Sequence, residues 1–228
     1  DTPAEYEPPD AVELGPLKGR IEFRDVVFSY PGTDIPVLDG VNLTIEAGQT
    51  VAVVGPNGSG KTTLVNLIPR FYDVSDGEIL IDSHDIRKLR QHDLRSQIGY
   101  VPQKSILFSG TIESNLTYAD EHASKEKINE AAATAQADHF INEKEQGYAF
   151  SIAQSGSNVS GGQKQRLSIA RALVNDYPIL IFDDSFSALD FKTDSQLRKA
   201  LYNKIRNTTV LIIAQRISTI MNADQILV

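Results

Sequence analysis

The sequence predicts an α/β fold with a mostly parallel central sheet, an antiparallel β-rich part at its N-terminal side and an inserted α-helical part. Short, wholly apolar runs such as Ile179–Phe182 and Val210–Ile213 are typical of parallel strands that are covered on both faces. Helix-forming stretches separate such runs, which favours layered α/β architecture. Near the start, apolar and polar residues alternate instead, as they do in half-exposed antiparallel strands.

Each element is expected from its own pattern. Alternation predicts the strands at 20–28 and 41–45, and a turn at Ala47–Gly48 follows the second of them. Short apolar runs indicate most later strands, and runs of good helix formers, alanine-rich before residue 140, indicate the helices. The expected strands are 20–28, 41–45, 50–54, 77–81, 98–101, 179–182 and 210–213. The expected helices are 61–69, 121–140, 163–175 and 192–206.

Composition narrows the class of protein. The 228 residues suffice for one large domain, and a net charge of −8 argues against a nucleic-acid binder with a broad basic surface. The absence of cysteine excludes disulfides, thiolate zinc sites and a cysteine nucleophile. No apolar stretch approaches the ~18–20 residues needed to cross a bilayer. Four histidines are scattered without the spacing of metal ligands.

The first nineteen residues differ in composition from the rest. They are rich in proline and acidic residues, so we expect 1–19 to be an extended linker and 20–228 to be the folded domain. The chain starts at Asp1 without a methionine or a signal-peptide pattern. We therefore expect it to be an excised part of something longer, with residues 1–19 leading from an absent transmembrane domain.

A phosphate-binding loop is the strongest chemical signal. The run from Gly55 to Thr62 fits G-x-x-x-x-G-K-[ST], and it lies between an apolar strand and a helix, as that motif requires. Glycines let successive backbone N–H groups turn around phosphate oxygens. Lys61 is expected to reach the β- and γ-phosphates, and the Thr62 hydroxyl to ligate Mg²⁺. The expected nucleotide-binding residues here are Gly55, Pro56, Asn57, Gly58, Ser59, Gly60, Lys61, Thr62 and Thr63.

Two further motifs accompany the loop. The apolar strand Ile179–Phe182 ends in Asp183, the Walker B pattern that positions Mg²⁺. Ser160-Gly-Gly-Gln163 stands directly before a predicted helix. A serine N-cap and two glycines at a helix start form a second anion site.

With these motifs the sequence resembles the nucleotide-binding domains of ABC transporters, whose signature is usually written L-S-G-G-Q. The resemblance runs from Arg20 to nearly the end, and Val159 replaces the common leucine. It implies a P-loop NTPase core with a helical subdomain at about 105–175, and a C-terminal end that is truncated here. It also implies an ATP sandwiched between two domains, with Ser160, Gly161, Gly162 and Gln163 facing the γ-phosphate that the opposite subunit holds.

The resemblance assigns roles to more positions. Tyr30 stands where the family places an aromatic ring on the adenine, and Gln103 where the Q-loop glutamine contacts Mg²⁺ and senses the membrane domain. Ser187–Asp190 matches the D-loop at the dimer interface. The segment 101–116 is especially similar to that of exporters, in which it meets the coupling helices of the transmembrane domain.

Three further positions depart from the family pattern. Asp184 replaces the usual catalytic glutamate and holds its carboxylate ~1 Å or more farther back, a shift that can cost ~10²-fold in rate. Gln215 replaces the switch histidine, so it can donate a hydrogen bond but cannot relay a proton. Gln154 replaces a glutamate that contacts the coupling helices in exporters. Asp184 and Gln215 together resemble the pattern of the subunit of heterodimeric multidrug exporters whose own ATP site hydrolyses slowly.

The expected function is therefore the ATP-binding domain of a heterodimeric exporter. It would be an ATP hydrolase using ATP and Mg²⁺, its own Walker site weakly active, and its partners a different ABC nucleotide-binding domain and the coupling helices, with no nucleic acid. It would work at the cytoplasmic face of the cell membrane. A regulatory nucleotide-binding module and an importer ATPase are the alternatives. An ABC-type DNA-repair ATPase is disfavoured because no heptad pattern lies between Lys61 and Ser160.

Overall fold

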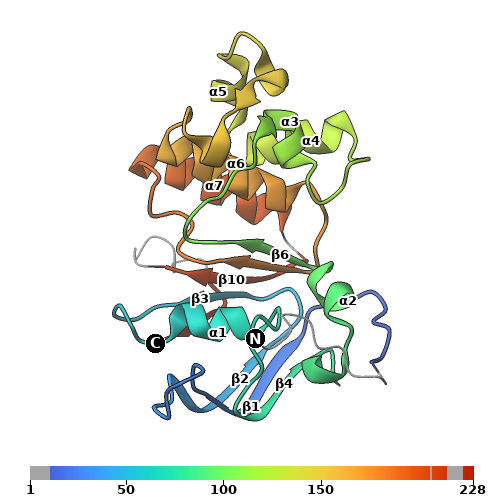
Figure 1. Cartoon of the computed structure of the whole chain (residues 1–228), viewed down its shortest axis with the longest axis vertical. Helices are drawn as coiled ribbons and strands as arrows, with labels where there is room; N and C mark the ends of the chain where they lie inside the picture. The colour runs from blue at the N-terminus through green and yellow to red at the C-terminus, as the bar shows by residue number, and fades with distance from the viewer. Residues whose placement is uncertain (1–10, 206, 215–222) are drawn as a thin grey trace. The chain divides into compact units, whose positions relative to one another are not determined.

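The computed structural model describes residues 11–205, 207–214 and 223–228, and Figure 1 labels many of its elements. The chain divides into two compact units. The sheet unit comprises Asp1–Ile98, Pro178–Ile181 and Asn207–Val228. The helical unit comprises Gly99–Tyr177 and Phe182–Arg206.

An antiparallel sheet forms the first part of the sheet unit. Its strand order is β2-β1-β4-β5, with β1 at Ile21–Phe28, β2 at Leu38–Ile45, β4 at Asp76–Ile81 and β5 at His84–Asp85. The pairing of β1 with β2 is irregular between Phe23 and Val26, and this irregularity keeps apolar side chains on the buried face along the whole strand. The expected antiparallel, β-rich start is confirmed.

Parallel strands form the second part of the sheet unit. There β3 (Thr50–Val53) lies between β11 (Gln225–Leu227) and β10 (Thr209–Ile213), and β9 (Ile179–Phe182) follows β10. Every residue of β9 and β10 is buried, which explains why their sequences are apolar throughout. Helix α1 (Lys61–Leu67) follows β3 after Val54 and the glycine-rich loop from Gly55 to Gly60.

The helical unit is built around α6 (Gly161–Leu173), which packs against two helices that precede it, α3 (Ile112–Leu116) and α4 (Lys125–Thr134). Figure 1 shows these helices side by side. The remaining elements of this unit are short, apart from the fourteen-residue α7. They are β6 (Ile98–Val101), β7 (Gly110–Thr111), α5 (Asp138–Asn142), η2 (Gly147–Ala149), β8 (Ser151–Ile152), η3 (Gln154–Gly156) and α7 (Phe191–Lys204).

The long helix expected over 121–140 is wrong, because the structure divides this stretch into α4 and α5. Gln136 has a φ of 57°, and this left-handed residue closes α4. The N–H groups of Ala135 and Ala137 then bond back to the carbonyls of Ala131 and Ala132. Ala135 and Ala137 are fully buried, so alanine is required there by the tight corner as well as by helix propensity. The first turn begins at the cap Ser124, not at residue 121.

The part of the N-terminal segment that the structure describes is bound to the sheet unit. The N–H of Val12 donates to the carbonyl of Lys88 at 2.9 Å. The carboxylate of Asp82 accepts hydrogen bonds from the backbone N–H groups of Lys18, Gly19 and Arg20, at 2.6, 3.2 and 2.9 Å. The division between a linker and a domain at residue 20 stays a prediction.

Two short helices of the sheet unit, η1 (Ile86–Lys88) and α2 (Gln91–Arg95), were not expected from the sequence. Within the ranges that the structure describes, no helix combines the length and apolarity that a bilayer crossing needs.

Candidate functional site

The loop between β3 and α1 has a backbone that only glycine adopts easily. Gly60 is the N-cap of α1 with a φ of 86°, and a Cβ there would lie 3.2 Å from the carbonyl oxygen of Val37. Gly55 has a φ of 152°, and its Cβ would lie 2.9 Å from the Ser59 hydroxyl. Glycine is therefore needed at both ends of the loop for the chain to make this turn.

Lys61 folds back over this loop. Its ammonium donates hydrogen bonds to the carbonyl oxygens of Gly55, at 2.9 Å, and of Pro56, at 2.6 Å. The ammonium is thus held at the loop itself, where an anion bound by the loop would meet its charge. Thr62 is exposed at the second position of α1, and Thr63 is buried. The residues from Pro56 to Ser59 form the exposed tip of the loop.

Tyr30 is fixed on the same unit by its hydroxyl and its ring. The hydroxyl shares a hydrogen bond of 2.9 Å with that of Thr63. The ring meets Phe28 and Tyr72 edge to face, with centroid distances of 4.9 and 5.3 Å. Tyr72 is an aromatic neighbour of the candidate adenine site that the sequence interpretation did not identify.

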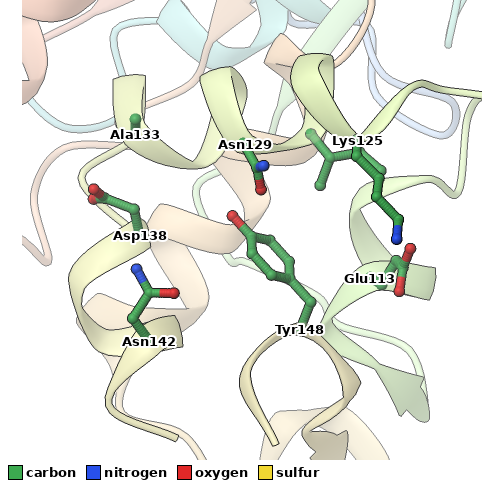
Figure 2. A pocket seen from close by; sticks show the side chains of 8 residues that line it. Glu113, Lys125, Asn129, Ala133, Asp138, Asn142 and Tyr148 are labelled. Carbon is green, nitrogen blue, oxygen red and sulfur yellow. The ribbon is translucent and has the colours of Figure 1, made fainter.

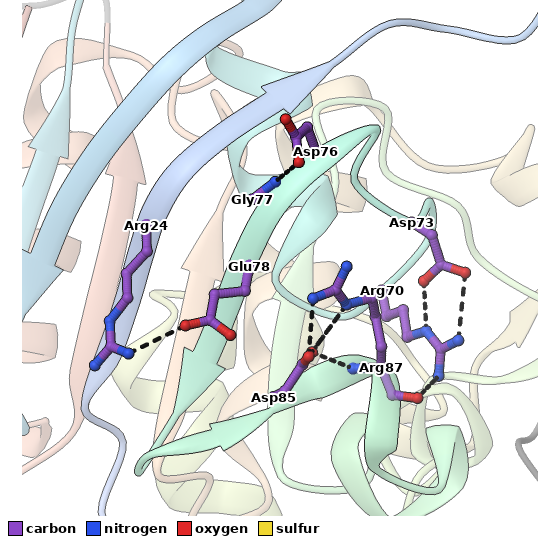
Figure 3. Close-up of polar contacts among 8 residues, drawn as sticks. All are labelled: Arg24, Arg70, Asp73, Asp76, Gly77, Glu78, Asp85 and Arg87. Atoms are coloured by element: carbon purple, nitrogen blue, oxygen red, sulfur yellow. Dashed lines mark hydrogen bonds and ion pairs between the residues drawn. The ribbon is translucent and has the colours of Figure 1, made fainter.

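The end of α1 is secured by buried arginine contacts. Arg70 has a φ of 55° and donates to the carboxylate of Asp73 at 2.6 Å and to the carbonyl of Arg87 at 3.2 Å. Figure 3 shows these contacts beside the pairs Arg87–Asp85 and Arg24–Glu78. Among these arginines, Arg70 has the most deeply buried side chain, at 4% exposure. Removing its partner Asp73 would therefore leave a buried positive charge without its counter-ion.

Two consecutive carboxylates lie in the helical unit, directly after β9. Asp183 is 4% exposed and Asp184 is 8% exposed. The Tyr100 hydroxyl donates to Oδ2 of Asp183 at 3.2 Å, and the Gln103 side-chain amide donates to Oδ2 of Asp184 at 3.1 Å. Asp184 has a φ of 46°, a left-handed conformation that aspartate tolerates better than most residues. The structure thus brings the Gln103 side chain to Asp184, which is next to Asp183 in the chain.

Tyr100 was not identified from the sequence. Burial and the nearby Asp183 carboxylate raise the pKa of Tyr100 well above its usual range, so the phenol stays a hydrogen-bond donor. The signal available was a hydroxylated aromatic residue within the otherwise apolar strand Ile98–Val101. Its partner is 83 positions away, which no local pattern can indicate.

The residues present fit Mg²⁺ by their chemistry. Asp183 and Gln103 carry carboxylate and carboxamide oxygens, and Thr62 carries a hydroxyl, which are the hard oxygen donors that Mg²⁺ prefers. Over the described ranges no three His, Cys, Asp or Glu side chains are grouped as a cage for a metal.

The expected second anion site begins α6. The Ser160 side chain accepts the N–H of Gln163 at 3.2 Å, and the Gln163 side chain accepts the N–H of Ser160 at 3.0 Å, which is a capping box. Within the described part of the chain, a Cβ on Gly161 would meet nothing within 4 Å, and one on Gly162 would meet only the carbonyl of Ala188, at 3.6 Å. The local backbone therefore requires neither glycine.

Other expected positions follow the acid pair. The Ser187 hydroxyl donates to the carbonyl of Asp184 at 2.9 Å, and the Asp190 side chain caps α7 by accepting the N–H of Thr193 at 2.9 Å. Gln154 is exposed at the start of η3. Gln215 lies outside the described residues.

An exposed aromatic patch, formed by Ile106, Phe108 and Tyr118, follows the Q-loop position. These side chains are 59%, 43% and 63% exposed. The rings of Phe108 and Tyr118 stack with centroids 4.4 Å apart, and the Arg171 guanidinium lies 5.6 Å from the Phe108 ring centroid. Large apolar groups held together at a surface are typical of a site that contacts another protein.

A separate hollow of about 560 Å³ opens on the helical unit. Figure 2 shows the Tyr148 hydroxyl pointing toward Asn129, and Lys125 and Glu113 side by side at one end. Burial, with a smaller effect of the Asp138 carboxylate, raises the pKa of Tyr148. None of the motif residues lines this hollow. Its mixed charges and carboxamides resemble a solvated surface more than an apolar ligand pocket.

Comparisons with known proteins agree with this geometry. The family model described as "ABC transporter" matches residues 38–187, which is more than half of the chain. The ATP-dependent lipid A-core flippase of Syntrophus aciditrophicus (strain SB) is 49% identical over 219 residues, covering 96% of this chain and 36% of that protein. The protein of the same name from Escherichia coli (strain K12) is 49% identical over 211 residues, covering 92% of this chain and 36% of the relative.

A solved structure is also similar. The chain aligns with a bacterial Atm1-family ABC exporter with ATP bound, at a TM-score of 0.92 and 39% identity, covering 99% of this chain and 40% of the exporter chain. This chain therefore spans little more than a third of the length of these relatives.

Proposed function

Because this chain belongs to the ABC transporter family, we propose that it is the ATP-binding domain of an exporter, and that it binds and hydrolyses Mg-ATP to drive export. The observation that carries the proposal is the loop from Gly55 to Thr62, with its positive-φ glycines and with the Lys61 ammonium held at it. The domain would act at the cytoplasmic face of a membrane, as a part of a longer transporter.

Each residue of the site has a role in binding or in the reaction. The loop N–H groups and Lys61 hold the phosphates, and Tyr30 stacks on the adenine. Thr62, Asp183 and Gln103 hold Mg²⁺, which when bound neutralises phosphate charge. Asp184 orients the attacking water and accepts its proton. The carboxylate of Asp184 is oriented for this step by the hydrogen bond that the Gln103 side-chain amide donates to it.

We propose further that ATP is shared between two such domains. Gly161 and Gly162 support this, because no described residue crowds their positions, whereas an outside phosphate could approach their N–H groups closely. The Ser160 cap holds the start of α6 in place for that contact. The signature of this chain would thus complete the ATP site of its partner.

The partner is proposed to be a different chain, because two departures fall on the Walker side of this one. The shorter Asp184 withdraws the base, and Gln215 cannot relay a proton as histidine does. The chain's own site would hydrolyse slowly, while the intact signature serves a faster site on the partner. The cargo is a second question, and the names of the flippase relatives favour a lipid.

The membrane domain is proposed to contact the patch of Ile106, Phe108 and Tyr118. The patch is exposed and rigid, because Phe108 and Tyr118 stack and the Arg171 guanidinium donates to the Ile106 carbonyl at 3.0 Å. It lies within and just after the segment 101–116 that resembles the coupling-helix contact of exporters.

Nucleotide titration tests the proposal. Lys61→Ala should weaken Mg-ATP binding to this chain by about 100-fold or more, because a charge-assisted contact to the phosphates is lost. Isothermal titration calorimetry measures the dissociation constant. Lys88→Ala, which removes an exposed lysine of the same unit, is the matched control and should leave it unchanged. Equal affinity of wild type and Lys61→Ala would refute the assignment.

A further inference from the structure

We propose that Tyr100 is a positioning residue for the carboxylate of Asp183, through the hydrogen bond that its hydroxyl donates. The inference deepens the proposed function and rests on it, since Asp183 there is a carboxylate that holds Mg-ATP. It concerns how this chain orients that carboxylate before a nucleotide arrives.

The contact joins two separate strands. Tyr100 is the third residue of β6, Asp183 directly follows β9, and the hydroxyl lies 3.2 Å from Oδ2. The main chain of Asp183 is held by the next residue of β6, because its N–H donates to the carbonyl of Val101 at 2.9 Å. Consecutive residues of β6 therefore fix the backbone and the side chain of Asp183. Such two-point attachment sets the plane of the carboxylate.

Tyr100 donates this hydrogen bond without carrying a positive charge, which matters because Asp183 is proposed to bind a cation. Asp183 and Asp184 are adjacent, and both are nearly buried, so their negative charges need donors. A lysine or arginine would stabilise them but would also cancel the charge that attracts Mg²⁺. Tyr100 and Gln103 each supply one hydrogen bond to one acid without adding positive charge. Two neutral donors thus order the pair of acids.

The orientation of the Asp183 carboxylate should affect the affinity for Mg²⁺, which can be measured. Mg²⁺ demands near-ideal octahedral geometry, so a carboxylate that rotates binds it less well. Loss of a group that hydrogen-bonds a ligating carboxylate typically costs 10–100-fold in metal affinity. Phenylalanine at this position keeps the ring and removes only the hydroxyl. The effect should therefore appear only when the metal is present.

The experiment compares ATP binding with and without metal. The dissociation constant of ATP is measured by calorimetry in excess MgCl₂ and in EDTA, and the EDTA value divided by the MgCl₂ value gives the contribution of the metal. Tyr100→Phe should lower this ratio about 10-fold and leave the EDTA value unchanged. Tyr148→Phe, a phenol of the same unit that does not contact the acid pair, should alter neither value.

Two results would overturn the inference. One is an unchanged ratio in Tyr100→Phe, and the other is an equal loss of affinity with and without metal, which would indicate a packing role alone. A cycle with Asp183→Asn adds a second test, because Tyr100→Phe should have no further effect on the ratio in that background, and additive effects would contradict it. A wild-type chain that binds no ATP in either buffer overturns the proposed function itself.

Discussion

The two helix starts that carry the anion-binding motifs are built in opposite ways. Helix α1 begins at Gly60, a left-handed residue without any side-chain cap. Helix α6 begins at Ser160, whose side chain and that of Gln163 satisfy each other's backbone N–H groups. The first start depends on glycine conformation, and the second on side-chain hydrogen bonds. A helix start can thus be fixed by the backbone conformation of a glycine or by hydrogen bonds from capping side chains.

The difference also concerns the glycines. Gly60 is crowded by Val37 and Leu38 and has a φ of 86°, so the fold itself requires it. Among the residues that the structure describes, Gly161 has no neighbour within 4 Å of its hypothetical Cβ. The glycine of α1 is therefore explained by the fold of its own chain, whereas crowding by the described residues does not explain the glycine at the start of α6.

The largest expected effect is on the ATPase activity of an assembled transporter, and it distinguishes a substitution at the start of α6 from one at the acid pair. Ser160→Arg should lower steady-state ATPase activity by about 100-fold or more, because a bulky cation replaces the cap beside the partner's γ-phosphate. Asp184→Asn should lower it by less than about half if little turnover passes through this chain's own site. Phosphate release by reconstituted transporters measures both. If Asp184→Asn stops turnover as fully as Ser160→Arg, Asp184 is a working base and the slow-site proposal is wrong.

A smaller effect distinguishes the glycines in the single chain. Gly60→Ala should weaken ATP binding about 10-fold or more, since a left-handed alanine costs ~1–2 kcal/mol before any crowding. Gly161→Ala should leave the ATP affinity of the isolated chain unchanged, because the loop is untouched and the site is open. Calorimetry on the two variants tests the contrast. Comparable losses in both would show that α6 contributes to binding within one chain.

The smallest effect concerns the cap of α6. Ser160→Ala removes one of the two reciprocal hydrogen bonds and should cost ~1 kcal/mol of stability, which lowers Tm by about 2–4 °C for a chain of this size. Thermal unfolding followed by circular dichroism measures it. Ser157→Ala, an exposed serine in the preceding turn, is the control and should shift Tm by much less. No difference between them would mean that packing alone sets the start of α6.

Much of the architecture was predictable because its patterns are local. The strands at 98–101 and 179–182 were predicted to the residue, since each is an apolar run of strand length. Helix α6 was predicted within two residues at each end, because its cap is written in the sequence. The break between α4 and α5 was missed, since Gln136 has no local feature that announces a left-handed conformation.

The candidate site follows the same rule. The phosphate loop could be read from consecutive residues, and Asp183 from the strand before it. The donors to the acid pair could not be read in this way, because Tyr100 and Gln103 lie 83 and 81 positions from their partners. The roles of the individual site residues stay predictions, and the short helices α2 and α3, of five residues each, are too brief for a periodic signal.

The Asp82 carboxylate that accepts the N–H groups of residues 18, 19 and 20 has a mechanical consequence. Gly19 is confined there as well, since a Cβ would lie 2.7 Å from the Thr209 hydroxyl, which itself donates to the Gly19 carbonyl. Three consecutive residues are thus anchored to one side chain. A force applied along residues 12–17 would therefore be transmitted to β10 through the contact between Gly19 and Thr209.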